Sequence, residues 1–312
     1  KFRQYGSFQA NPSQVDYGIG LNFGAGEWYT GDPAVASNAG TLPSIATAGV
    51  PGVIQANWNN LYLASGSASG LVADVKGVAQ PTAVSVEWGS AGTWSSTGRG
   101  EENNAMPGND YILMTGYLDT GDPSTTTVKI SNLPDILYGN SYDVYVYALG
   151  GVQARGGGYR ILGADNTTVL ADYVDAQSPQ DPTTYVEAVP APGQWAVGNY
   201  IVFKGLKGQM ASTITVEATT ADPHGYGGTD RAPVNAVQLV MTRVAPPECK
   251  ITYVFDPPDT LCLTWDCDKG ELYSAPTVLG PWTPVTSTGP TPSPYCTKTS
   301  ERMRFYCIRL GP

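Results

Sequence analysis

Cysteine is absent from the first 248 residues of this chain, and histidine occurs only once, as His224. A zinc site needs several cysteine or histidine ligands, so these shortages argue against zinc chemistry in most of the chain. No apolar run reaches the roughly 18 residues that a membrane-spanning helix needs. Charged residues form only 14% of the chain, whereas about 25% is usual.

Basic clusters are also lacking. Residues 1–248 hold 11 Lys and Arg against 21 Asp and Glu (11 − 21 = −10), and residues 249–312 hold six of each. Binding to nucleic acid phosphates needs clustered positive charge, so this acidic body argues against a nucleic acid partner.

Turn-forming and aromatic residues are abundant instead, with 37 Gly, 25 Pro and 19 Tyr. Disordered chains have few aromatics and high charge, so we expect a folded, turn-rich β protein. Short runs with a period of two predict strands at 17–23, 71–75, 83–88, 111–118, 126–130, 142–149, 159–162, 168–174, 200–203, 212–217 and 234–242.

The clearest strand is Tyr142–Leu149, which has aromatic and β-branched residues on both of its faces. This pattern is typical of a central strand that is covered on two sides. Many short strands separated by Gly, Pro and Asn predict an all-β fold with a large jelly-roll-like β-sandwich.

A hinge is predicted at 244–249, where two consecutive prolines precede Cys249. We therefore expect an N-terminal extension at 1–16, a β-sandwich domain at 17–244 and a small β-sandwich module at 249–312. The module has predicted strands at 251–255, 261–265, 271–274, 282–285 and 304–310. It is too short to bury a large core, so disulfides would stabilise it.

All five cysteines lie in this small module. Clustered cysteines indicate an oxidising compartment, so we expect a secreted protein at the cell surface or outside the cell, with its leader removed before Lys1. We expect Cys262, Cys267, Cys296 and Cys307 to form disulfides. Cys249 is expected to be the unpaired cysteine, either buried or bridging to a neighbouring copy.

Several phrases resemble secreted β-sandwich surface proteins of environmental bacteria, which carry a small C-terminal β module. They are found at 52–60, 113–119, 142–147, 199–203 and 231–240, and in the module at 263–265, 271–282, 293–295 and 305–306. The resemblance implies the same two-part fold but no particular activity. Two departures are the five cysteines and the lack of a hydrophobic sorting tail after Pro312.

Catalytic patterns are weak. His224 follows Asp222 and precedes Asp230, either of which could orient it, but Gly66–Gly70 has alanine where a nucleophile elbow needs serine. The pair Glu101 and Glu102 is interpreted as an exposed loop pair rather than as glycosidase acids. We predict no catalytic residue and no cofactor other than calcium, for which the candidate ligands are Asp119, Asp122, Asp222 and Asp230.

Aromatic side chains near predicted loops give a second kind of candidate site. Rings at the rim of a sandwich stack on sugar faces, so Trp28, Tyr29, Trp58 and Trp94 are candidate ligand-binding residues. They favour a carbohydrate-binding protein with an extracellular polysaccharide as its partner.

The N-terminal nine residues are both basic and aromatic, and no other Lys or Arg occurs before Lys76. Such a segment is suited to adding as a strand to another copy, with Lys1, Phe2, Arg3, Tyr5 and Phe8 at the interface. Our leading hypothesis is an extracellular structural or adhesive subunit that forms a homo-oligomer or a filament by strand exchange. Carbohydrate binding is the alternative, and a polysaccharide hydrolase has the least support.

Overall fold

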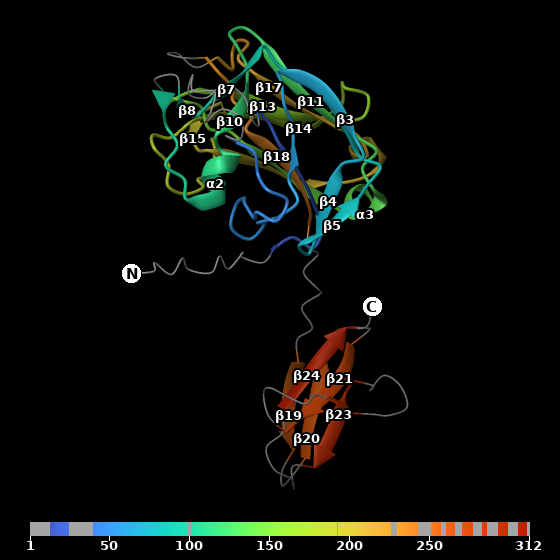
Figure 1. Ribbon diagram of the computed structural model, residues 1–312. Helices are drawn as coiled ribbons and strands as arrows, with labels where there is room; N and C mark the ends of the chain where they lie inside the picture. The colour runs from blue at the N-terminus through green and yellow to red at the C-terminus, as the bar shows by residue number, and fades with distance from the viewer. Residues whose placement is uncertain are drawn as a thin grey trace, which may run out of the picture. The chain divides into compact units, whose positions relative to one another are not determined.

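The computed structural model describes residues 13–24, 40–98, 101–191, 193–225, 230–242, 251–256, 260–265, 270–276, 283–285, 293–298 and 305–310. The chain divides into two compact units, Lys1–Thr242 and Arg243–Pro312, next to the predicted hinge. Strands take up 48% of the chain and helices 6%, so the all-β prediction is confirmed (Figure 1). No helix in the described ranges is long and apolar enough to cross a membrane.

Eight strands of the larger unit form a jelly roll. They are β1 (Gly18–Asn22), β11 (Thr125–Ser131), β12 (Tyr142–Tyr147), β13 (Gly156–Leu162), β14 (Val169–Gln177), β16 (Tyr200–Leu206), β17 (Ile214–Thr219) and β18 (Ala236–Met241). Sheet I contains them in the order β16-β12-β18-β1, and sheet II in the order β14-β13-β17-β11. Each strand is followed by one in the opposite sheet, except that β13 continues into β14.

Shorter strands extend both sheets. They are β2 (Asn59–Asn60), β3 (Ser65–Ser69), β4 (Val72–Val75), β5 (Val78–Pro81), β6 (Ser85–Gly89) and β15 (Ala196–Val197). Sheet I continues from β1 through β4 to β5, and sheet II continues from β11 through β6 to β3. The edge strands β3 and β5 lie on the same side of the sandwich (Figure 1).

Among its described residues, the larger unit also contains two small ribbons and three short helices. The ribbons pair β7 (Gly92–Ser95) with β10 (Gly116–Asp119), and β8 (Thr97–Gly98) with β9 (Glu101–Glu102). The helices are α2 (Gly108–Leu113), α3 (Asp135–Tyr138) and the 3-10 helix η1 (Gln209–Ala211).

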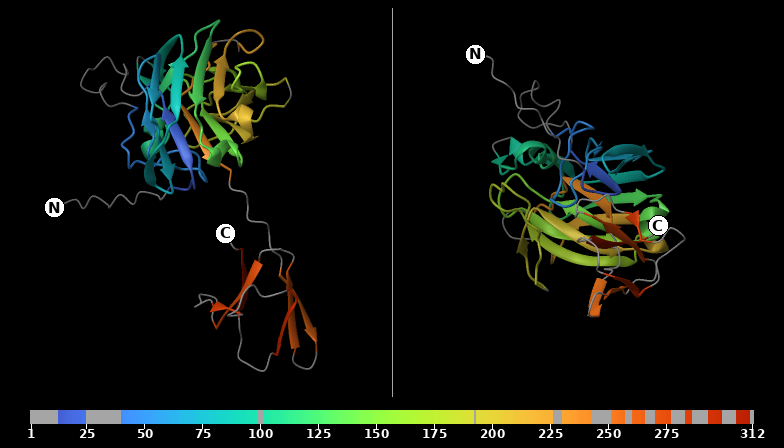
Figure 2. Two further views of the ribbon diagram at one scale, coloured as in Figure 1. Left: turned by 90° about the vertical axis from the view of Figure 1, so that its right-hand side faces the viewer. Right: turned by 90° about the horizontal axis from the view of Figure 1, so that it is seen from below.

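The main core lies between the two sheets, which stack face to face (Figure 2). Val144 and Val146 of β12 reach it from sheet I, and Val128 and Ile130 of β11 reach it from sheet II. Alternate residues of β11 are buried and at least partly exposed, as a strand with one open face requires.

A second core covers the outer face of sheet I. Tyr147 packs there with Trp58 and with Leu113 of α2, while Tyr145 lies at its margin. The prediction that Tyr142–Leu149 contains a central strand covered on two sides is therefore confirmed. No such second core covers the outer face of sheet II among the described residues.

One predicted strand is partly wrong. Residues 111–118 contain the end of α2 and then β10, rather than one continuous strand. Pro107 stands at the N-cap and Asp110 lies in the first turn, and both are helix-start features. A six-residue helix is too short to show helical periodicity, so its apolar run resembles a strand.

The small unit contains two three-stranded sheets, ordered β19-β20-β23 and β22-β21-β24. Leu263 and Trp265 from the first sheet share a buried cluster with Leu272 from the second. A disulfide joins Cys262 to Cys296 on neighbouring strands. The strands are β19 (Ile251–Asp256), β20 (Thr260–Trp265), β21 (Gly270–Ala275), β22 (Thr283–Pro284), β23 (Tyr295–Lys298) and β24 (Phe305–Leu310).

Candidate functional site

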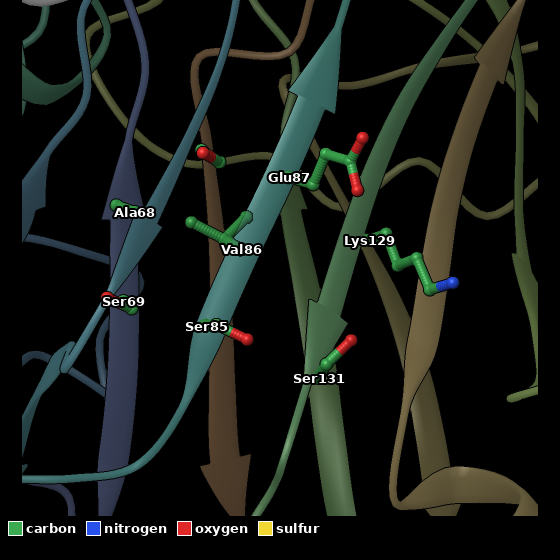
Figure 3. A pocket seen from close by; sticks show the side chains of 8 residues that line it. Ala68, Ser69, Ser85, Val86, Glu87, Lys129 and Ser131 are labelled. Carbon is green, nitrogen blue, oxygen red and sulfur yellow. The ribbon is translucent and has the colours of Figure 1, made fainter.

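A polar groove of about 430 Å³ lies on sheet II across β3, β6 and β11 (Figure 3). Glu87 and Lys129 project on the same side of neighbouring strands, and small serines surround them. No ion pair within 4.0 Å joins Glu87 to another described residue. The polar side chains that line the groove are Ser67, Ser69, Ser85, Glu87, Lys129 and Ser131.

His224 lies over sheet II beside Gly158, where an added Cβ would come within 2.7 Å of the imidazole. Its Nδ1 is 2.6 Å from Oδ1 of Asp175, so the expectation that Asp222 or Asp230 orients it is wrong. The ring also packs against Tyr173 at a tilt of 32°, with centroids 3.9 Å apart. The correct acid is 49 residues away in sequence, and no local pattern points to it.

Tyr173 connects this histidine to an ion pair. Its hydroxyl donates to Oε1 of Glu217 over 2.5 Å, and Nε of Arg160 donates to the same oxygen over 2.7 Å. Burial and the adjacent Glu217 carboxylate raise the pKa of Tyr173, so the phenol stays protonated. Gly66–Gly70, the other half of the tested catalytic pattern, holds edge strand β3 rather than a nucleophile elbow.

Glu101 is held by a bidentate pair with Arg155. The guanidinium donates to both carboxylate oxygens, over 2.7 and 2.6 Å, and also to the hydroxyl of Tyr117 over 2.8 Å. Trp94 Nε1 donates to the same carboxylate over 2.7 Å. The interpretation of Glu101 as an exposed loop residue is therefore wrong, because only 20% of its side chain is exposed.

This ion pair gives Glu101 a structural environment rather than a catalytic one. A glycosidase acid needs a clear approach to substrate, whereas the Glu101 carboxylate already accepts hydrogen bonds from Arg155 and Trp94. Asp110, the nearby carboxylate in sequence, accepts hydrogen bonds elsewhere, from Gly49 N–H and from Tyr185 Oη. Burial raises the pKa of Asp110.

Asp119 is the most buried of the four calcium candidates. Its Oδ2 accepts from Arg231 over 3.2 Å, and burial raises its pKa. Asp230 forms an isolated β-bridge with Gly156 through its backbone, while Asp122 and Asp222 are exposed. No three side chains of the metal-ligating types gather in the described part of the chain, so calcium gains no ligand cluster there.

The two described candidate tryptophans, Trp58 and Trp94, do not form an exposed rim. Trp58 is only 4% exposed, its Nε1 donates to the Gln55 carbonyl, and its ring packs edge-on against Tyr147. The prediction that Trp58 stacks on a ligand is therefore wrong. Trp94 is half-buried and hydrogen-bonded to Glu101, which leaves it a poor sugar platform. Trp28 and Tyr29 lie outside the described residues.

The cysteine prediction has one confirmed pair, Cys262 with Cys296. Cys307 lies in β24, and its pairing stays a prediction. Cys249 and Cys267 lie outside the described residues, as do the five N-terminal interface candidates Lys1, Phe2, Arg3, Tyr5 and Phe8.

An apolar edge strand in the small unit is the candidate that sequence reasoning missed. β19 is the outermost strand of its sheet, yet Tyr253 is 74% exposed and Val254 65% exposed. Tyr253 lies directly opposite Leu263, which is 5% exposed and belongs to the core. Opposite residues share a face of the sheet, so Tyr253 stands on the core side of β19 without being covered.

The outer edge of β19 also presents backbone groups that pair with no other described strand. Trp265 of β20 exchanges hydrogen bonds with the Ser293 hydroxyl on the side of β23, so odd-numbered residues of β20 point away from β19. Even-numbered residues therefore form the β19–β20 ladder, including Val254 with Cys262. The N–H and C=O groups of Ile251, Tyr253 and Phe255 consequently point outward.

No protein-family model, curated protein or solved structure matches this chain. The resemblance to bacterial surface proteins therefore stays a prediction, and function has to be argued from the geometry alone.

Proposed function

We propose that this chain is an extracellular structural or adhesive subunit that assembles with copies of itself and has no catalytic activity. The observation that carries the proposal is edge strand β19, with Tyr253 and Val254 mostly exposed on its two faces. Folded proteins protect apolar edges with charge, proline, bulges or a covering segment, because bare edges pair with other chains. In a subunit that is meant to pair, such an edge is useful.

The polar clusters of the larger unit support a non-catalytic role. Arg155 pairs with Glu101, Arg160 with Glu217 and His224 with Asp175. In each pair the two side chains lie 2.6–2.7 Å apart, and no group of three His, Cys, Asp or Glu side chains that could hold a metal occurs among the described residues. Such pairs rigidify a sandwich, which suits a building block exposed outside the cell.

Microscopy and sedimentation of the full chain test this function. We expect negative-stain images to contain filaments or oligomers, and the weight-average mass to rise with concentration. A 32.9 kDa monomer at every concentration would overturn the proposal.

A carbohydrate-binding role is the second candidate, and the groove on sheet II favours it. Its open polar floor of serines with Glu87 and Lys129 offers hydrogen bonds to sugar hydroxyls, although no described aromatic ring lines it. If sugar binds there, Glu87→Gln together with Lys129→Met should abolish retention on a polysaccharide column without lowering the Tm. Retention that survives this double substitution would remove the groove as the site.

A further inference from the structure

We propose that residues 1–9 of one copy add as a strand to the free edge of β19 in the next copy. This inference rests on the proposed self-assembly and names both partners of the contact. Because the donor and the acceptor are different segments of the chain, the contact is heterologous. Repetition of a heterologous contact that does not close gives an open filament.

The acceptor needs both backbone partners and apolar cover. Ile251, Tyr253 and Phe255 direct their N–H and C=O groups toward the free edge, which gives an added strand a ladder. Tyr253 stands on the core side of β19 and is 74% exposed, so the small core is open at this edge. An added strand with an aromatic face would close it.

The donor has the alternation that this edge requires. In an extended conformation, Phe2 and Phe8 fall on one face with Gln4 and Gly6, whereas the two cations fall on the other. The phenylalanine face would lie toward Tyr253, where aromatic cross-strand pairs are favourable. Nine extended residues span about 30 Å, and the six residues of β19 about 20 Å, so the donor is long enough.

Two edge strands of the sandwich, β3 and β5, are poorer acceptors. β3 is Ser-Gly-Ser-Ala-Ser, so an added strand would cover almost no apolar surface there. β5 ends in Pro81, which lacks an N–H. Compared with β3 and β5, β19 therefore offers an added strand both outward backbone groups and exposed apolar surface.

A peptide in trans tests the donor. Full chain lacking residues 1–9 would be titrated against a labelled peptide Lys1–Gln9, followed by fluorescence anisotropy. The control is a peptide of the same composition whose order breaks the two-residue alternation. We expect the native peptide to bind at least tenfold more tightly than the control. Equal binding of the two peptides would overturn the inference.

A matched pair of prolines tests the acceptor. Tyr253→Pro removes an outward N–H from β19 without touching the β19–β20 ladder. Ser67→Pro does the same at β3, where the Ser90 N–H to Ala64 carbonyl bond shows that odd-numbered residues point outward. We expect Tyr253→Pro to abolish assembly and peptide binding, and Ser67→Pro to leave both unchanged. The reverse result would place the acceptor on β3 and overturn the inference.

Loss of the strand contact has to be distinguished from misfolding of the variant and from failure of the proposed self-assembly. A Tyr253→Thr variant keeps the backbone N–H and a strand-forming side chain, so it should assemble more weakly than wild type without losing assembly altogether. If Tyr253→Pro and Tyr253→Thr instead misfold, both variants would lose the unfolding transition of the small unit that depends on its disulfide. If wild-type chains assemble and the deletion of residues 1–9 also assembles, only the donor inference fails. If wild-type chains never assemble, the proposed function fails with it.

Discussion

Replacing Arg155 with methionine should destabilise the larger unit by about 3 kcal/mol. The guanidinium makes three hydrogen bonds of 2.6–2.8 Å, and only 10% of its side chain is exposed. Removing one partner of a buried ion pair costs roughly 3–5 kcal/mol, because the other charge stays buried without compensation. We take the lower end, since Glu101 keeps 20% exposure and its bond from Trp94.

The expected shift in Tm follows from the size of the unit. For a domain of about 240 residues, 1 kcal/mol moves the Tm by roughly 2–4 °C, so the single substitution should lower it by about 6–12 °C. Scanning calorimetry of the full chain measures this shift, provided that the transition of the larger unit is assigned separately.

The double variant Arg155→Met with Glu101→Gln makes the test sharper. It removes both charges together, so it should cost about 1 kcal/mol or less, well below the sum of the two single substitutions. A loss under about 1 kcal/mol for Arg155→Met alone, or additive losses in the cycle, would refute a structural role for this pair. Glu101 would then again be a candidate catalytic carboxylate.

Three further outcomes are expected. Trp58→Ala should cost about 3–5 kcal/mol in unfolding experiments, because the ring is buried; lost polysaccharide retention at an unchanged Tm would contradict this. Burial raises the folded-state pKa of Asp110, so the charged Asp110 carboxylate destabilises the folded state at neutral pH. This destabilisation is relieved as the pH falls through the folded-state pKa toward the unfolded-state pKa of about 3.9. Asp110→Asn should therefore be at least as stable as wild type at pH 7 and lose that advantage near pH 4, as urea titrations at both values would show. Breaking the Cys262–Cys296 disulfide, which spans 34 residues, should destabilise only the small unit, by about 4 kcal/mol in a calorimetric comparison with a double serine variant; an unchanged small-unit transition would count against it.

The sequence predicts the strands with apolar alternation well. Strand Tyr142–Tyr147 can be predicted from sequence because its short run has apolar residues on both faces of the strand. Both faces are apolar because the strand lies between two cores. Strand β3 cannot be predicted from sequence, because Ser-Gly-Ser-Ala-Ser has no apolar alternation and its strand conformation comes from pairing with β6. Local strand propensity does not predict a strand that forms only through tertiary pairing.

The polar and aromatic sites were harder to predict for a related reason. The partner of His224 lies 49 residues away, and that of Glu101 lies 54 residues away. Trp58 looked like a loop residue but packs on Tyr147, 89 positions along the chain (147 − 58). Long-range pairings of this kind decide which side chains are buried and which partners they meet, and a single sequence does not show such pairings.

β19 shows where sequence and structure say more together than either does alone. An apolar run such as Ile251–Phe255 is typical of a strand buried on both sides, because uncovered apolar surface is unfavourable in water. The structure instead places this run at a sheet edge, with its central residues Tyr253 and Val254 exposed. Among the described residues, β19 has a paired neighbour on one edge only, and a strand from another copy is the neighbour that we propose for the other edge.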